Sequence, residues 1–95
     1  MRAQGDTAVR ASPSITVRFR FLARYAELLG LETTSIHLTA PATVADAVAV
    51  LRARLPGGHV LPERPLVALN QEHVLGTRPV QDGDELALLP PLAGG

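Results

Sequence analysis

The sequence contains no cysteine. A disulfide scaffold, a thiolate metal site and a cysteine nucleophile are therefore all excluded. Aromatic residues are also scarce, at 3% of the chain against 46% for all hydrophobic residues. The core is therefore predicted to consist of aliphatic side chains.

Lysine is absent as well, because all nine basic residues are arginine. No lysine side chain can accept an isopeptide bond on this protein. The nine basic residues are balanced by nine acidic residues, which leaves no net charge. A nucleic-acid-binding domain of this size usually carries a basic excess, so we expect no nucleic-acid partner.

Long apolar runs are missing too. No stretch approaches the roughly 18 residues of a membrane span, and residues 1–14 lack the apolar segment of a secretory signal. We therefore expect a cytoplasmic protein without a membrane partner.

The length of 95 residues corresponds to one small domain. We divide it into a flexible leader at 1–14, a folded domain at 15–89 and an extended functional tail at 90–95.

Alternating apolar and polar residues predict two strands near the start of the domain. The alternation covers residues 15–21 and again residues 33–39. Between them, apolar residues from Leu22 to Leu29 recur at helical spacing and predict a short amphipathic helix. Gly30 suits the position just after the end of that helix.

A longer helix is predicted over residues 44–55. Thr43 is a suitable N-cap, and Asp46 stands three residues later, as in a capping box. Apolar residues at helical spacing along the segment predict that one face of the helix is buried.

The remainder of the domain is predicted to form short strands. They lie at residues 66–69, around 73–75 and at 85–89, with a tight turn at 82–84. The connection between the first two strands of the chain is too short for a crossover between parallel neighbours. A mixed sheet packed on the helix at 44–55 is the simplest arrangement. This arrangement is an α+β fold of the β-grasp type.

The chain ends in Gly94 and Gly95, after a segment that cannot extend the last strand. Pro90 and Pro91 lack the amide hydrogens that a strand ladder needs. The extended residues 90–95 reach at most about 20 Å, and glycine has no Cβ to obstruct passage through a narrow channel. The unhindered terminal carboxylate of Gly95 is therefore a candidate reactive group, which adenylylation would convert into an acyl donor.

Several segments of the second half resemble one known family. They are residues 69–71 (LNQ), 79–85 (PVQDGDE) and 88–95 (LLPPLAGG), and residues 21–23 (FLA) fit as well. In these segments the chain is similar to the ubiquitin-like sulfur carriers that form the small subunits of molybdopterin synthases. The resemblance extends over roughly residues 15–95.

The resemblance implies a ubiquitin-like β-grasp fold and a carrier function. An E1-like adenylating enzyme would activate the carboxylate of Gly95 with ATP, and a sulfur donor protein would convert the acyl adenylate to a thiocarboxylate. The large catalytic subunit of molybdopterin synthase would then use that sulfur to form the dithiolene of molybdopterin. The chain itself would bind no permanent cofactor and supply no catalytic side chain.

The resemblance also indicates which residues meet the partners. The tail that carries Gly95 into a partner's active site would consist of Pro90, Pro91, Leu92, Ala93 and Gly94. Docking in the family uses the outer face of the sheet and the last strand, for which the candidate residues here are His73 and Leu89. Arg18 and Arg20 alternate outward on the first strand and form either part of a partner surface or an ordinary solvated face. His73 departs from the family, because relatives often have an apolar residue at that position.

Other functions fit the same sequence. A sulfur carrier for thiamine, cysteine or tRNA thiolation would use the same chemistry, although Pro90 and Pro91 favour the pterin acceptor. A ubiquitin-like protein modifier would pass its activated carboxylate to lysines of target proteins, and a plain β-grasp binding module would not use its tail.

No metal site is predicted, because His37, His59 and His73 lack metal-ligand spacing.

Overall fold

The computed structural model describes residues 13–91 of the chain. The elements in chain order are β1 (Ser14–Phe21), α2 (Arg24–Leu29), β2 (Thr33–Thr39), β3 (Ala42–Thr43), α3 (Val44–Arg54), a 3₁₀ turn (Gly58–Val60), β4 (Leu66–Leu69), β5 (Glu72–Val74), β6 (Pro79–Val80) and β7 (Glu85–Leu89). The predicted bounds of the four longer strands (β1, β2, β4 and β7) and of the main helix (α3) are confirmed to within one residue. The predicted leader at 1–14 lies almost entirely outside the described residues, and β1 begins at Ser14.

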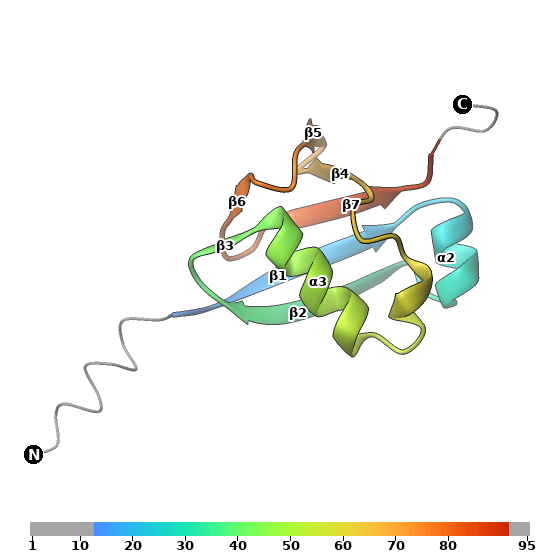
Figure 1. The fold of residues 1–95 in the computed structure, drawn as a ribbon, viewed down its shortest axis with the longest axis horizontal. Coiled ribbons are helices and arrows are strands. Elements are labelled where there is room, and N and C mark those ends of the chain that lie inside the picture. The colour runs from blue at the N-terminus through green and yellow to red at the C-terminus, as the bar shows by residue number, and fades with distance from the viewer. Residues whose placement is uncertain (1–12, 92–95) are drawn as a thin grey trace, which may run out of the picture.

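The main sheet has five strands in the order β2-β1-β7-β4-β5. β1 runs antiparallel to β2 and parallel to β7, and β4 runs antiparallel to both β7 and β5. α3 crosses one face of this sheet (Figure 1). The predicted mixed sheet packed on one main helix is therefore confirmed, and the first two strands are antiparallel, as the short connection between them requires.

The start of α3 is held by the predicted capping box. The Thr43 hydroxyl accepts a hydrogen bond from the Asp46 amide at 3.2 Å, and the Asp46 carboxylate accepts one from the Thr43 amide at 2.9 Å. These bonds satisfy amide donors that have no partner within the helix. Thr43 is also the last residue of the short strand β3, where it pairs with Pro79 of β6, so the helix starts at a fixed position beside that ladder.

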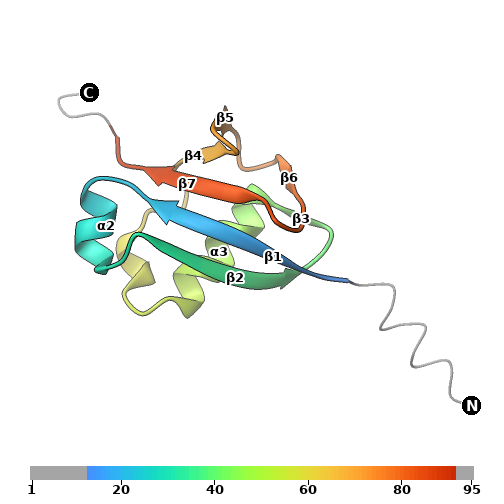
Figure 2. The ribbon, with the colours of Figure 1, turned by 180° about the vertical axis from the view of Figure 1, so that it is seen from behind.

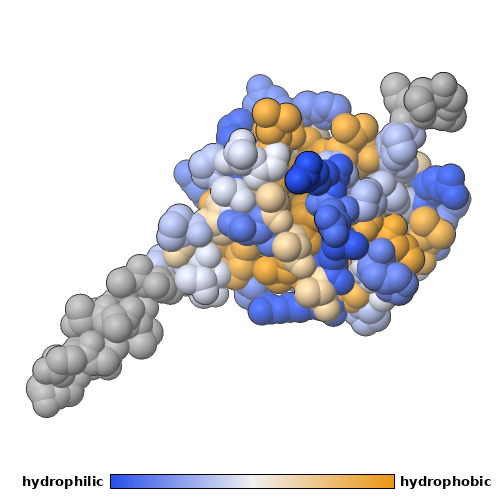
Figure 3. Space-filling view, in the orientation of Figure 1, coloured by the Kyte–Doolittle hydropathy of each residue, from blue (hydrophilic) through white to orange (hydrophobic). Residues whose placement is uncertain are grey.

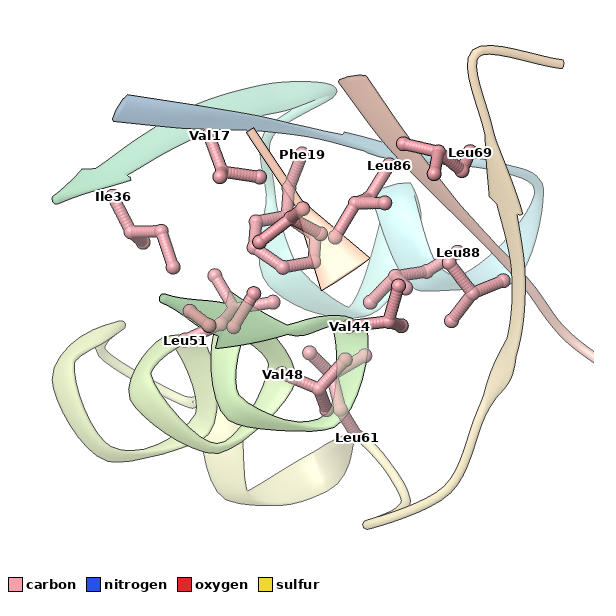
Figure 4. Close-up of a cluster of buried hydrophobic side chains, with 14 of the residues drawn as sticks. Val17, Phe19, Ile36, Val44, Val48, Leu51, Leu61, Leu69, Leu86 and Leu88 are labelled. Atoms are coloured by element: carbon pink, nitrogen blue, oxygen red, sulfur yellow. The ribbon is translucent and has the colours of Figure 1, made fainter. Parts of the chain in front are cut away.

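The core lies between α3 and the inner face of the sheet (Figure 4). Side chains from β1, β7 and α3 meet there without any exposed surface: Val17, Phe19, Ala47, Leu51, Leu86 and Leu88. Burying one large apolar side chain stabilises a fold by about 1.5–3 kcal/mol. The inward side chains of β1 and β7 thus hold these two central strands against the core. The side chains on the opposite face of the two strands are not needed for this packing.

The first helix begins later than predicted. Leu22 was expected in it, but the amide of Leu22 donates a hydrogen bond to the carbonyl oxygen of Leu88 at 3.3 Å, which continues the contact between β1 and β7. Ala23 then has a φ of 52° and separates the strand from the helix at Arg24. Gly30 follows the helix with a φ of 74°, as predicted for its position.

One further feature was not predicted, and one predicted strand is shifted by a residue. β3 and β6 form a separate two-stranded ladder, and two-residue strands have too few side chains to show an alternation. β5 covers Glu72–Val74, one residue earlier than expected, because Asn70 and Gln71 both adopt positive φ in a two-residue hairpin turn. Leu75 consequently lies beyond the strand, with 79% of its surface exposed.

Candidate functional site

The last strand of the chain occupies the centre of the sheet. β7 is flanked by β1 on one side and β4 on the other, and its residues Leu86 and Leu88 are completely buried. The final ladder pair joins Leu89 to Leu66 at the start of β4. The chain therefore leaves the domain from a strand that is fixed by both neighbours and by the core.

The predicted functional tail begins at this exit. Pro90 is half-buried and Pro91 is exposed, and neither has an amide hydrogen that could extend the ladder. The rest of the predicted site, which consists of Leu92, Ala93, Gly94 and Gly95, lies outside the described residues.

The outer face of the sheet is opposite α3, and no helix of residues 13–91 lies over β1 and β7 on this side (Figure 2). Cross-strand pairing places Arg20, Ala87, Ala68 and His73 in one row across this face. Neighbouring strands lie about 4.8 Å apart, so Arg20 and His73 are separated by about 14 Å. The structure therefore brings the predicted docking residues of β1 and β5 onto the same face, at opposite ends of one row.

An apolar patch lies on the outer face beside the exit. We call it the exit patch; it consists of Leu66, Ala68, Ala87 and Leu89. Leu89 is half-buried there, whereas its partner Leu66 is 45% exposed. Ala68 is only 8% exposed although it does not belong to the core cluster. Any partner that receives the tail from this exit would meet the exit patch first.

Positive charge lies next to the exit patch. Arg18 and Arg20 are both exposed on β1, and Arg18 is paired in register with Glu85 of β7. Within residues 13–91 the one salt bridge joins Arg52 to Glu63, at 4.0 Å and away from this face. The two guanidinium groups are thus available to acidic or carbonyl groups of a partner, each with five hydrogen-bond donors.

Sequence reasoning missed Leu66 and Ala68 as members of this surface. The signal was present, since every second residue of a strand faces the same way: Val67 and Leu69 point to the core, so Leu66 and Ala68 must point outward. What the sequence lacked was the register of β4 against β7, which places Leu66 beside Leu89.

A separate groove lies on the α3 side of the molecule. It has a volume of about 770 Å³ and runs between the start of α3, residues 63–67 and residues 73–77. Figure 3 looks onto this side and shows apolar surface interrupted by hydrophilic side chains. Of the predicted docking residues, only His73 borders this groove, and of the exit patch only Leu66 does.

Residues 13–91 contain neither a metal-ion cluster nor a membrane-spanning helix. No group of three or more histidine, aspartate or glutamate side chains in this part of the chain is arranged to hold a metal ion. No helix among these residues is long and apolar enough to cross a membrane.

Comparison with known proteins identifies the family. The model of the ThiS family matches residues 19–95, which include the last strand and the whole tail. This chain belongs to the ThiS family. The expected relationship to the ubiquitin-like sulfur carriers is therefore confirmed, and so is the β-grasp fold.

Two relatives in this family have the same name, molybdopterin synthase sulfur carrier subunit. The protein from Arabidopsis thaliana is 28% identical over 82 residues, which are 86% of this chain and 85% of the relative. The protein from Chlamydomonas reinhardtii is 32% identical over 84 residues, which are 83% of this chain and 98% of the relative. The match therefore covers nearly the full length of both relatives.

Solved structures of similar fold include a small archaeal modifier protein and a complex of molybdopterin-converting factor subunits. SAMP1 from Haloferax volcanii superimposes with a TM-score of 0.73 at 30% identity, over 84% of this chain and 99% of that one. A complex of subunits 1 and 2 of the molybdopterin-converting factor from Helicobacter pylori contains a chain that matches with a TM-score of 0.60 at 26% identity, over 85% and 100% of the two chains. A protein of this fold is thus known in complex with a second subunit.

Proposed function

We propose that this protein is the sulfur carrier subunit of a molybdopterin synthase. The observation that carries the proposal is the family match through residues 19–95, together with two relatives of that name that align over nearly their whole length. The geometry of the exit supports it, because β7 holds the start of the tail rigidly between two strands while Pro90 and Pro91 stop the sheet.

The reacting group is the terminal carboxylate of Gly95. Its oxygen attacks the α-phosphorus of ATP in an E1-like adenylating enzyme, and pyrophosphate leaves. Sulfide from a sulfur donor protein then attacks the acyl carbon and displaces AMP, which leaves a thiocarboxylate. In the synthase the thiocarboxylate sulfur attacks a carbon of the pterin precursor and displaces an oxygen substituent from it. Water then cleaves the acyl–sulfur bond, which restores the carboxylate of Gly95 and leaves the sulfur on the pterin. We place this chemistry in the cytoplasm, where ATP is available.

The large catalytic subunit is the partner that receives the loaded tail. We propose that it docks on the outer face, with the exit patch as the apolar centre and Arg18 and Arg20 as polar contacts at its side. Residues 90–95 can extend at most about 20 Å from the exit, so the partner's reaction centre must lie within that distance of Leu89. ATP is consumed by the activating enzyme, and the carrier contributes its tail and its docking surface but no catalytic side chain.

Intact mass spectrometry tests the carrier chemistry. The full chain is incubated with ATP, the adenylating enzyme of the same organism and a sulfide source, beside a reaction without ATP. A mass gain of one oxygen-to-sulfur exchange that maps to Gly95 is expected. If no gain appears while the adenylating enzyme is active on another carrier, the proposal is wrong.

Protein modification is the second candidate, and the likeness to SAMP1 from Haloferax volcanii at 30% identity favours it. In that case the acyl adenylate would pass to lysines of target proteins. Trypsin does not cleave before proline, so it cannot cut the chain after Arg64 or Arg78. The natural chain would therefore leave a long remnant on each modified lysine after digestion. An Ala93→Arg variant therefore supplies a cleavage site that leaves a Gly-Gly remnant on each modified lysine. Such remnants in cell extract, absent when Gly95 is deleted, would establish this function.

A further inference from the structure

The outer edge of β2 is open in the described part of the chain. β2 is an edge strand of the main sheet, and no strand within residues 13–91 pairs with its free side. Edge strands of native proteins are commonly blocked by lysine, proline or a bulge. None of these is present in β2, whose sequence is TTSIHLT, and its ladder to β1 is regular over seven residue pairs.

The backbone groups on this free edge can be assigned from the register. The Phe21 amide donates to the Glu32 carbonyl at 2.8 Å, and the Ala40 amide donates to the Pro13 carbonyl at 2.8 Å. In an antiparallel ladder, hydrogen-bonded pairs alternate with pairs that are not bonded. Even-numbered residues of β2 therefore bond to β1, and the amides and carbonyls of the odd-numbered residues point outward: Thr33, Ser35, His37 and Thr39.

A groove runs beside this edge. It has a volume of about 300 Å³ and is formed by residues 34–37 of β2 together with Leu51, Arg54, Leu55 and Pro56. Its apolar walls offer room for an aliphatic side chain of an added strand. Arg54 is the one charged residue in its lining, and no acidic residue borders it.

Arg54 is already placed on the edge. Its Nη1 donates to the His37 carbonyl oxygen at 3.2 Å, one of the outward-pointing groups. A carbonyl oxygen can accept two hydrogen bonds, and a guanidinium has five donors. Arg54 can therefore keep this contact while His37 accepts a bond from an added strand, and its remaining donors can bind a carboxylate of that strand.

We propose that β2 binds an extended peptide segment of a partner protein that carries a carboxylate side chain. The segment adds a sixth strand to the sheet, places an apolar side chain in the groove and pairs its carboxylate with Arg54. A second copy of this chain is a poorer occupant, because symmetric β2–β2 pairing would bring two Arg54 side chains to one short ladder with no acidic residue in either groove.

This surface is independent of the carrier chemistry. β2 and the pair β4–β5 are the opposite edges of the main sheet, with β1 and β7 between them (Figures 1 and 2). A peptide on β2 therefore leaves the exit patch uncovered. A partner can be held there before or while the tail reacts elsewhere.

Backbone NMR on the full chain tests the proposal. The probe is a blocked synthetic peptide of alternating valine and threonine with one central aspartate, and its control has asparagine instead. Binding is expected to slow hydrogen exchange at the outward amides of β2, whereas the even-numbered amides are already protected by β1. The asparagine peptide is expected to bind about two- to fivefold more weakly, as for an exposed ion pair.

Two variants separate the backbone and charge contributions. Arg54→Gln should remove the difference in affinity between the two peptides. Ser35→Pro removes an outward amide without removing a bond to β1, and should weaken both peptides by about tenfold, whereas Ser35→Ala should not. The proposal is overturned if the peptides protect other residues, if Ser35→Pro binds them normally, if aspartate gives no advantage, or if the free chain dimerises through β2.

Discussion

Replacing Leu66 by aspartate is the sharpest test of where the large subunit docks. Leu66 belongs to the exit patch and is 45% exposed. Covering that remaining surface is worth about 1 kcal/mol of binding free energy, since full burial of a leucine contributes about 1.5–3 kcal/mol. A buried carboxylate without a partner adds a penalty of about 1–3 kcal/mol. Together these effects exceed about 2 kcal/mol, which is a loss of affinity of about 30-fold or more.

The assay is isothermal titration calorimetry of the carrier against the large subunit from the same organism. Leu75→Asp is the matched control, because Leu75 is 79% exposed and borders the same groove as Leu66 but does not belong to the exit patch. The control should bind as the natural chain does. Thermal unfolding of both variants checks that the domain is intact. An unchanged affinity for Leu66→Asp, or an equal loss for both variants, would refute docking through the exit patch.

Other substitutions test the docking face, the tail and the fold. Leu89→Asp should weaken binding of the large subunit in calorimetry, and unchanged affinity would show that Leu89 is not a contact. Deletion of Gly95 should abolish sulfur loading in mass spectrometry but leave the unfolding temperature unchanged; continued loading would exclude Gly95 as the acceptor. Thr43→Ala should lower the free energy of unfolding in urea by about 1 kcal/mol, and no loss would mean that the capping box is dispensable. Gly58→Ala should cost about 1–3 kcal/mol in the same assay, because its Cβ would come within 2.8 Å of the Arg52 backbone oxygen; an unchanged midpoint would show that the turn can move freely.

The candidate site was partly readable from the sequence. The tail could be predicted as a site because Pro90, Pro91 and the terminal glycines are adjacent in the chain, and their chemistry does not depend on the fold. Arg18 and Arg20 were placed on one strand face by their alternation with buried residues. Their neighbours across the sheet could not be assigned, since alternation describes one strand and not its register against another.

The sequence by itself determined the elements whose signals are local. The alternation in β1 and β2, the helical spacing of α3 and its capping box with Thr43 and Asp46 each involve residues within a few positions of one another. Such patterns depend on backbone geometry and on local hydrogen bonds. The predicted strands and the main helix therefore agree with the structure to within one residue.

Only the tertiary structure decided how those elements form a working surface. The parallel pairing of β1 with β7 joins residues more than sixty positions apart, as in Phe21 and Leu88, and it puts the last strand at the centre of the sheet. The pairing of Leu66 with Leu89 forms the exit patch in the same way. Such contacts form where whole faces can be buried together, and no short segment of sequence contains that information.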